Sequence, residues 1–315
     1  MATETFLGIE MGGTKLLIGE VDRLGNILRY KKYKSAFFNQ ESAIQIIESS
    51  FQDYKDTVGW VGAKPSGIGI GLMGRVDPGK GIWHQIDPFR THPVELAAMV
   101  ERFTSIPCKI DNDVKSATRA ERVWGVGQFS KNFVFISVGS GIGVGTVVGG
   151  RQIRGSHFNA GEAGHMSVSG GIGVKCTCGR TDCAEAIASR TGIDRCARLL
   201  KDRYETSLSI PPFGEGLVDA EEVFAREKEG DPLCKVLIEN AARAIADLIM
   251  NMVRVTDPDT VVLGGSIIVM GNLFTRVLSL LHAPTMRFVT NGVVLTRLNP
   301  KFVGLLGAAA VAMDM

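Results

Sequence analysis

Residues Gly161–Glu185 read GEAGHMSVSGGIGVKCTCGRTDCAE. Zinc in structural sites takes four tetrahedral ligands, commonly three thiolates and one imidazole. The stretch supplies that set with His165, Cys176, Cys178 and Cys183. The alternative is three buried thiols beside a surface histidine, but cysteines at ordinary frequency rarely cluster this way. The stretch therefore predicts a structural zinc site.

Two acids, Glu162 and Glu185, lie at the ends of this stretch, so a bound zinc ion would hold both in one place. A zinc ion closed by four protein ligands has no position for a catalytic water, so we expect the metal to shape the site only. The two acids would then be the functional groups of the site, although either one alone could be a solvated surface residue.

Two strand–glycine–strand patterns occur. Phe6–Glu10 and Leu16–Val21 are predicted strands around Met11-Gly12-Gly13-Thr14-Lys15, and Phe133–Val138 leads through the glycines of Gly139–Gly145 into another strand. A single glycine turn is as easily an ordinary hairpin. Adjacent backbone N–H groups in such turns can bind anions, so two turns could grip one polyphosphate. No GxxxxGK sequence occurs, which excludes a Walker site.

The predicted strand Pro107–Asp111 ends in the polar residues Asp111-Asn112-Asp113, and a predicted helix over Val114–Trp124 follows. Open α/β sheets usually bind ligands at the carboxyl ends of their strands. Helix capping is the alternative, but capping needs one such residue and not three.

Further along, Asp231 and Pro232 are predicted to open a long helix to about Val255. A third glycine pair, Gly264-Gly265, comes after the predicted strand Thr260–Leu263, and we expect a helix to follow it.

The chain has 315 residues, enough for two domains, and a net charge of +2 without a basic stripe, which argues against a nucleic-acid partner. Phe133–Gly150 carries no charge, but its glycines favour two strands joined by a turn over a membrane span. Six cysteines without a recognisable secretory signal indicate a reducing cytoplasm.

The strand–glycine–strand turns resemble those of the sugar kinase, heat-shock ATPase and actin superfamily, and the chain as a whole resembles the ROK family of sugar kinases. The motifs that carry this resemblance are Met11–Lys15, Asn112–Asp113, Gly139–Gly145, Gly161–His165, Cys176–Cys183 with Glu185, and Gly264–Gly265. The resemblance implies an α/β, two-lobed, actin-like/hexokinase (ribonuclease H-like) ATPase fold with a structural zinc site. We expect a small lobe of residues 1–111 plus 300–315, a large lobe of residues 112–299 with the zinc motif, and a cleft between them.

The resemblance implies an ATP-dependent sugar kinase that uses Mg²⁺ and carries Zn²⁺, with Asp113 as general base on the sugar hydroxyl. The residues it implies for sugar binding are Gly74, Asn112, Asp113, Glu162, His165 and Glu185. Those it implies for the nucleotide are Glu10, Gly12, Gly13, Thr14, Lys15, Gly139, Ser140, Gly141, Gly264 and Gly265. The sequence departs from the family pattern at several positions. Glu10 replaces a frequent Asp, Asp182 replaces a usual glycine, and Met73 and Arg75 replace prolines that are common in the glucokinase members.

Gly74-Arg75, Asp111-Asn112-Asp113 and Arg180–Ser189 are most similar to N-acetylmannosamine kinases, and Ser156-His157-Phe158 is similar to that group too. Glucose, allose, fructose and N-acetylglucosamine are the alternative substrates within the family. A sugar-sensing module without turnover is the alternative from another class, and the intact Asp113 with both glycine turns favours an enzyme. We also expect a homodimer.

Overall fold

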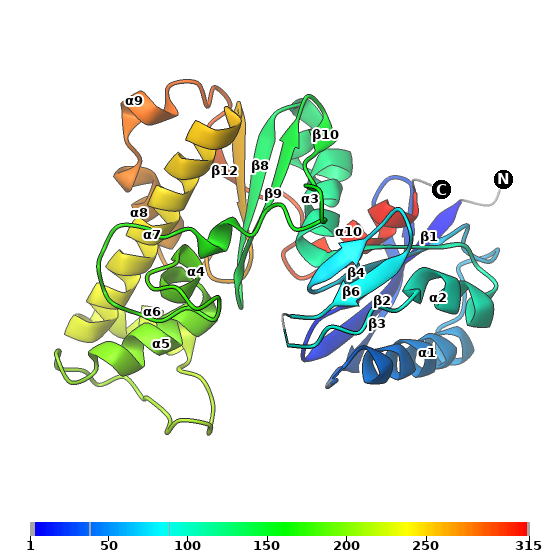
Figure 1. Ribbon diagram of the computed structural model, residues 1–315, viewed down its shortest axis with the longest axis horizontal. Coiled ribbons are helices and arrows are strands. Elements are labelled where there is room, and N and C mark those ends of the chain that lie inside the picture. The colour runs from blue at the N-terminus through cyan, green and yellow to red at the C-terminus, as the bar shows by residue number, and fades with distance from the viewer. Residues whose placement is uncertain (1–3, 38, 88, 314–315) are drawn as a thin grey trace. The chain divides into compact units, whose positions relative to one another are not determined.

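The computed structural model describes residues 4–37, 39–87 and 89–313, which form two compact units (Figure 1). Unit 1 comprises Met1–Phe129, Arg154–Asn159 and Arg297–Met315, and unit 2 comprises Ser130–Ile153 and Ala160–Thr296. The C-terminal segment thus belongs to unit 1. The lobe limits expected from the sequence stay a prediction; they differ from the compact units mainly in assigning residues 112–129 to the large lobe.

The elements of unit 1 are β1 (Thr5–Met11), β2 (Lys15–Asp22), β3 (Ile27–Lys34), α1 (Gln40–Thr57), β4 (Ile68–Leu72), β5 (Arg75–Asp77), β6 (Ile82–Gln85), α2 (Leu96–Thr104), β7 (Cys108–Asn112), α3 (Asp113–Trp124), η1 (Val126–Phe129) and α10 (Val303–Ala312). Its main sheet has the order β3-β2-β1-β4-β7. β1, β2 and β3 pair antiparallel, whereas β1, β4 and β7 pair parallel.

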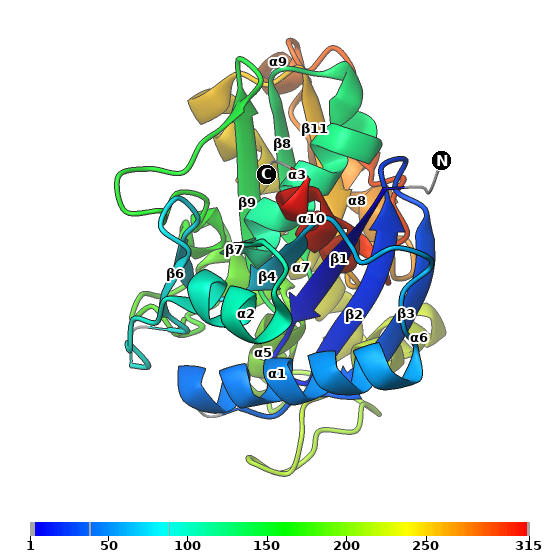
Figure 2. The same ribbon diagram turned by 90° about the vertical axis from the view of Figure 1, so that its right-hand side faces the viewer.

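The alternation of side chains along these strands decides what covers each face of the sheet. Helices α1 and α2 cover one face of the sheet and α10 covers the other (Figure 2). Leu7 and Ile9 belong to the core that α1 and α2 complete, while Gly8, between them, faces α10. A Cβ on Gly69 of β4 would lie 1.8 Å from the carbonyl oxygen of Ala308 in α10. The glycines therefore let α10, a helix of small residues, lie directly on the sheet.

The elements of unit 2 are β8 (Phe133–Val138), β9 (Ile142–Val148), β10 (Arg151–Gln152), η2 (Ala163–His165), α4 (Ala184–Ala188), α5 (Arg190–Leu200), α6 (Ala220–Glu229), α7 (Pro232–Thr256), β11 (Thr260–Gly264), α8 (Leu273–Leu280), α9 (Ala283–Met286) and β12 (Val293–Leu295). The sheet order is β10-β9-β8-β11-β12, again an antiparallel hairpin arrangement followed by two parallel strands. The two units thus repeat one sheet topology.

Several sequence-based predictions can now be compared with the structure. Both glycine turns join antiparallel strands, and α7 runs over Pro232–Thr256, capped by the Asp231 side chain, so these predictions are confirmed. The second turn is shorter than the predicted Gly139–Gly145, because β9 already begins at Ile142 and pairs with β8 from there. A helix follows Gly264-Gly265, as expected, but turns come first and α8 begins only at Leu273. Among the described residues, no helix is long and apolar enough to cross a membrane.

Candidate active site and metal centre

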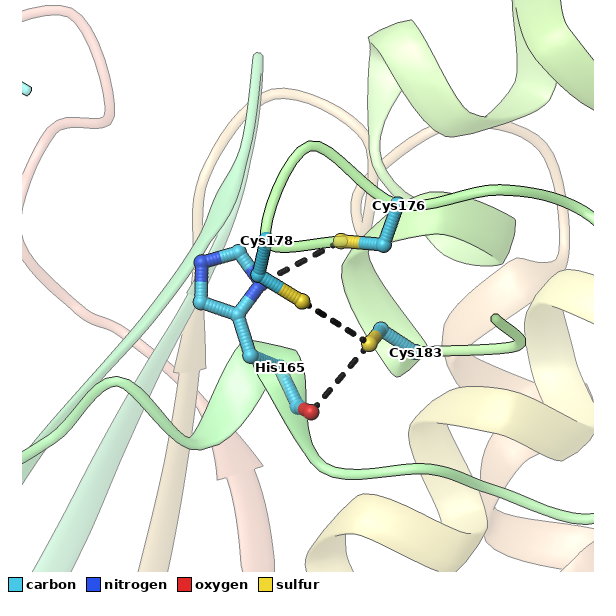
Figure 3. Close-up of side chains that lie close together, drawn as sticks. All are labelled: His165, Cys176, Cys178 and Cys183. Carbon is cyan, nitrogen blue, oxygen red and sulfur yellow. Dashed lines mark hydrogen bonds between the residues drawn. The ribbon is translucent and has the colours of Figure 1, made fainter. Parts of the chain in front are cut away.

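The zinc-type residues of the sequence converge in unit 2 (Figure 3). One ligand atom from each of His165, Cys176, Cys178 and Cys183 lies within 4.8 Å of all the others. Cys176 Sγ lies 3.3 Å from His165 Nδ1, and Cys178 Sγ lies 3.6 Å from Cys183 Sγ. A tetrahedron with Zn–S bonds of about 2.3 Å has S–S edges of about 3.8 Å. The four side chains therefore fit a zinc ion without large rearrangement.

Backbone conformation brings these ligands together. The chain folds back on itself through bridges between Lys175 and Thr181 and between Ser167 and Cys183. Gly179 has a φ of +89°, which glycine adopts without steric cost. Cys183 then precedes α4 directly, so the cluster fixes where that helix begins.

Asp182, which stands where a glycine is usual in the family, keeps a left-handed backbone with a φ of +53°. Such a conformation costs most residues about 1–2 kcal/mol, but Asp tolerates it better because its side chain can bond locally. The Asp182 carboxylate accepts hydrogen bonds from the backbone N–H groups of Gly173 and Val174, at 2.9 and 3.0 Å. These bonds offset the strain, so the departure is compatible with the loop that holds the cysteines.

The thiols of the cluster differ in acidity. The backbone N–H of Arg180 lowers the pKa of the Cys178 thiol, whereas burial raises the pKa of the Cys183 thiol to about 12. Zinc binds thiolates and not thiols, so metal binding would release protons here and depend on pH.

His165 can serve two partners at once, because its ring has two nitrogens. Nδ1 faces Cys176, and Nε2 lies 3.9 Å from a carboxylate oxygen of Glu162, whose side chain is half exposed. Both residues line a cavity of about 390 Å³. The other lining residues are Thr146, Ile153, Gly161, Ala163, Met166, Arg180, Met252, Val255 and Thr256. A metal on Nδ1 would fix the ring and leave Nε2 for another ligand.

Glu185, on the short helix α4, reaches the second glycine turn. Its carboxylate accepts a hydrogen bond from the backbone N–H of Ile142 at 2.9 Å. A Cβ on Gly141 would lie 2.7 Å from the same carboxylate oxygen, so a larger residue there would displace the Glu185 side chain. The predicted sugar ligand and the predicted phosphate turn are therefore adjacent in unit 2.

The second and third glycine turns lie at one edge of the unit 2 sheet. Gly264 is in register with Ser137, the residue before Val138 at the end of β8. A Cβ on Gly265, which has a φ of +96°, would lie 2.3 Å from the carbonyl oxygen of Val138. Gly139 and Ser140 come directly after Val138, and the Thr191 hydroxyl donates to the Ser140 carbonyl at 3.1 Å. The predicted nucleotide residues of this unit thus form one group.

In unit 1 the first glycine turn closes with a hydrogen bond from the Gly12 N–H to the Lys15 carbonyl at 2.9 Å, and it exposes Gly13 and Thr14. Glu10 lies just before this turn with its side chain 20% exposed, and its Oε2 atom is buried without a hydrogen-bond partner among the described residues. Burial raises the pKa of the Glu10 carboxyl, which Lys15, 3.6 Å away, partly opposes.

The longer side chain of Glu10 has room because the facing residue of α10 is Gly304. A Cβ on Gly304 would lie 2.4 Å from Cδ of Glu10. No pattern in the sequence predicts this pairing, since the two residues stand at opposite ends of the chain.

The remaining predicted residues of unit 1 meet at the carboxyl edge of its sheet, where Met11, Leu72 and Asn112 are in register. The Asn112 side chain accepts hydrogen bonds from the first turn of α3, as the capping interpretation expects, and its amide also donates to the carbonyl of Gly74 at 3.0 Å. Gly74 has a φ of +85°. Asp113 is the half-buried first residue of α3.

One close partner of these residues was missed by the sequence reasoning. Arg154 makes two hydrogen bonds to Asp111, the residue before Asn112. Arg154 belongs to no recognisable motif, and only the folded chain shows its partner.

Comparison with known proteins identifies the family of the chain. The family model described as "ROK family" matches residues 6–315. The chain is 28% identical to a glucokinase of Halalkalibacterium halodurans over 85% of this chain and 82% of that protein. It is 29% identical to an N-acetylmannosamine kinase of Haemophilus influenzae over 83% of this chain and 80% of that protein. A ROK hexokinase structure from Thermus thermophilus matches with a TM-score of 0.77 at 26% identity, over 98% of both chains.

The duplicated sheet with its glycine turns and the family match define an ATP-dependent carbohydrate kinase, and they confirm the expected fold class. Within that class, the chain belongs to the ROK family.

Proposed function

We propose that this protein transfers the γ-phosphoryl group of ATP to the 6-hydroxyl of a hexose or N-acetylhexosamine. The observation that carries the proposal is the repeated sheet, which presents one strand–glycine–strand turn in each unit. Backbone N–H groups in such turns bind phosphate oxygens, and phosphoryl transfer depends mainly on positioning and charge neutralisation.

Asp113 would accept the proton of the sugar hydroxyl. A sugar hydroxyl is a poor nucleophile, and a carboxylate within hydrogen-bond reach contributes about 10²–10⁴-fold to such a reaction. Asp113 is suited to this role because it begins α3 at the carboxyl edge of the unit 1 sheet, half-buried and next to the capping residue Asn112.

The sugar itself would be held by Gly74, Asn112, Glu162, His165 and Glu185. Carboxylates, an amide and an imidazole recognise alternating hydroxyl donors and acceptors, and therefore stereochemistry, through directed hydrogen bonds. The Asn112–Gly74 bond in unit 1 and the Glu162–His165 pair in unit 2 support this set, because each interaction orients a group that can meet a hydroxyl.

The nucleotide would be held by three groups of residues. In unit 1 they are Gly12, Gly13, Thr14 and Lys15, and in unit 2 they are Gly139, Ser140 and Gly141 together with Gly264 and Gly265. Mg²⁺, when bound with ATP, neutralises phosphate charge. Glu10 is the residue of unit 1 that would place a carboxylate beside it, and the buried Oε2 atom, which has no partner among the described residues, supports this role.

Zinc would be bound by His165, Cys176, Cys178 and Cys183, and would act structurally because all four positions are filled by protein. Binding through Nδ1 would orient His165 Nε2 for the sugar, which links metal binding to sugar binding. The fit of the four ligand atoms supports this proposal.

N-acetylmannosamine is our proposed substrate, on the sequence similarities around Gly74 and Arg180–Ser189. Relatives named glucokinase and N-acetylmannosamine kinase have nearly equal identity, 28% and 29%, so glucose is the first alternative. Allose, fructose and N-acetylglucosamine come next. We further propose a homodimer in a reducing cytoplasm, which suits six free thiols, without a nucleic-acid or membrane partner.

Coupled ADP release, measured with ATP and Mg²⁺ against a panel of hexoses and N-acetylhexosamines, tests this proposal. We expect turnover, with the highest kcat/KM for N-acetylmannosamine. A higher kcat/KM for glucose would overturn the substrate and keep the reaction. Thermal protection by a sugar without any ADP release would overturn the enzyme and indicate a sugar sensor.

A further inference from the structure

A buried ion pair lies immediately before the residues proposed for catalysis. Asp111, at the end of β7, has a side chain that is 1% exposed, and its two carboxylate oxygens accept hydrogen bonds from Arg154 Nη1 and Nη2 at 2.8 and 2.7 Å. Two parallel bonds between planar groups fix the orientation of both side chains, which a single lysine contact would not do.

The Asp111 carboxylate also binds the residue that follows it, Asn112. Asp111 Oδ1 also accepts the backbone N–H of Asn112 at 2.8 Å. The Asn112 side chain in turn accepts the N–H groups of Val114 and Lys115 at 3.1 and 3.2 Å, and so sets the start of α3 where Asp113 stands. Arg154 therefore orients the Asp111 carboxylate, which fixes the backbone of Asn112. The Asn112 side chain in turn fixes the start of α3, where Asp113 is the first residue.

Three positively charged side chains lie around the Asp111 carboxylate. Lys109 lies on the same side of β7 as Asp111, and with Arg119 and Arg154 it lines a cavity of about 200 Å³. Among the described lining residues, Asp111 is the one carboxylate facing these three cations. Burial lowers the pKa of Arg119 to about 10, while the charge of Asp111 opposes that shift.

Arg154 also stands at a particular place in the chain. It begins the segment Arg154–Asn159, which belongs to unit 1 although the residues on both sides belong to unit 2. The next residues are Ala160, Gly161 and Glu162. The ion pair therefore fixes the start of the segment that leads to Glu162, a proposed sugar ligand.

We propose that Arg154 is a positioning residue for phosphoryl transfer: through Asp111 it holds Asn112 and Asp113 in their working orientation. This inference rests on the proposed function, in which Asn112 binds the sugar and Asp113 accepts the proton. Stability alone is a weak reason for such a pair, because a buried ion pair can often be replaced by uncharged residues without loss.

The test compares Arg154→Lys and the double variant Asp111→Asn/Arg154→Met with the wild type. Lysine keeps the charge but loses the paired bonds. The double variant removes both charges and keeps an acceptor for the Asn112 N–H. We expect Arg154→Lys to melt within a few degrees of wild type, and the double variant to melt lower because Lys109 and Arg119 lose the facing carboxylate. Both should lower kcat about 10- to 100-fold and raise the sugar KM, with an unchanged KM for ATP.

Arg198→Lys is the matched control. Arg198 Nε lies 3.0 Å from both carboxylate oxygens of Asp194, and its Nη2 lies 2.9 Å from Oδ1, at similar burial, in helix α5. It should match the wild type in kcat.

The outcomes separate the two proposals. A folded Arg154→Lys or double variant with kcat within twofold of wild type overturns the positioning role and leaves the function standing. Equal losses in Arg154→Lys and Arg198→Lys also overturn it, since the effect would be general. A wild type without sugar turnover overturns the proposed function, and the positioning role with it.

Discussion

The carboxylate of Glu185 accepts a hydrogen bond from the backbone N–H of Ile142 at 2.9 Å. Glu185 lies two residues after the metal-type ligand Cys183, and Ile142 begins β9 directly after the second glycine turn. One carboxylate thus joins the cysteine cluster to the turn proposed to hold phosphate. Metal, sugar and nucleotide binding are therefore expected to depend on one another in unit 2.

Replacing Glu185 should separate its two tasks. In Glu185→Gln the amide oxygen can still accept the Ile142 N–H, so we expect the sugar KM to rise about 10- to 100-fold with little change in the KM for ATP. Glu185→Ala removes the acceptor as well, and both KM values should rise. Steady-state kinetics with each substrate varied will show this. If Glu185→Ala raises only the sugar KM, the hydrogen bond from Glu185 to the glycine turn does not contribute to ATP binding.

Asp113→Asn keeps the shape and the hydrogen bonds of Asp113 but removes the base. Sugar binding, measured by calorimetry, should stay near that of wild type, while kcat falls about 10²–10⁴-fold. Glu185→Gln is the comparison, because it should mainly weaken binding. Near-normal kcat in Asp113→Asn with every hexose tested would show that another group takes the proton.

Elemental analysis should find one zinc ion per chain. Cys178→Ser removes one of four ligands, so we expect loss of zinc, a lower melting temperature and lower activity together, since metal binding is linked to folding. Cys234→Ser, which changes a buried thiol outside the cluster, should keep its zinc. Active protein purified without any zinc would contradict this prediction.

Asp182→Ala should destabilise the cysteine loop by about 1–3 kcal/mol, because alanine tolerates a positive φ poorly and cannot accept the Gly173 and Val174 N–H bonds. Asp182→Asn, which keeps an acceptor and tolerates the conformation, is the control. Asp182→Gly should fall between them. The melting temperature and the rate of zinc removal by a chelator will rank the three variants by stability. Equal values for Asp182→Ala and Asp182→Asn would refute this prediction.

The cap of α7 should make stability depend on pH. Burial alone would raise the pKa of Asp231, but the N–H groups of Cys234 and Ser207 and the Thr206 hydroxyl lower it to about 2. Because this value lies below the ordinary 3.8, the ionised cap stabilises the fold above pH 4, and its contribution declines between pH 4 and 2. Wild type should therefore melt higher than Asp231→Asn at pH 7. The difference should shrink below pH 4, and a difference independent of pH would count against this role of the cap.

Local patterns in the sequence determined the elements and the residue types of the site. Alternating strands around Met11–Lys15 and Gly139–Gly145 predicted hairpins, and Asp231-Pro232 predicted the start of α7, because period and capping act between near neighbours. The four metal-type ligands were also found from the sequence, since ligand identity and short spacing restrict the chemistry. Turns over residues 266–272 were not foreseen, because a glycine pair alone does not determine the conformation of the residues after it.

Tertiary structure decided the contacts between distant residues. Gly304 faces Glu10 and Arg154 pairs with Asp111 only because α10 and the segment Arg154–Asn159 return to the sheet of unit 1. Many cations in the sequence could have paired with Asp111, and many glycines could have faced Glu10. Which of them does so depends on how whole elements pack, and a pattern of near neighbours carries no information about that packing.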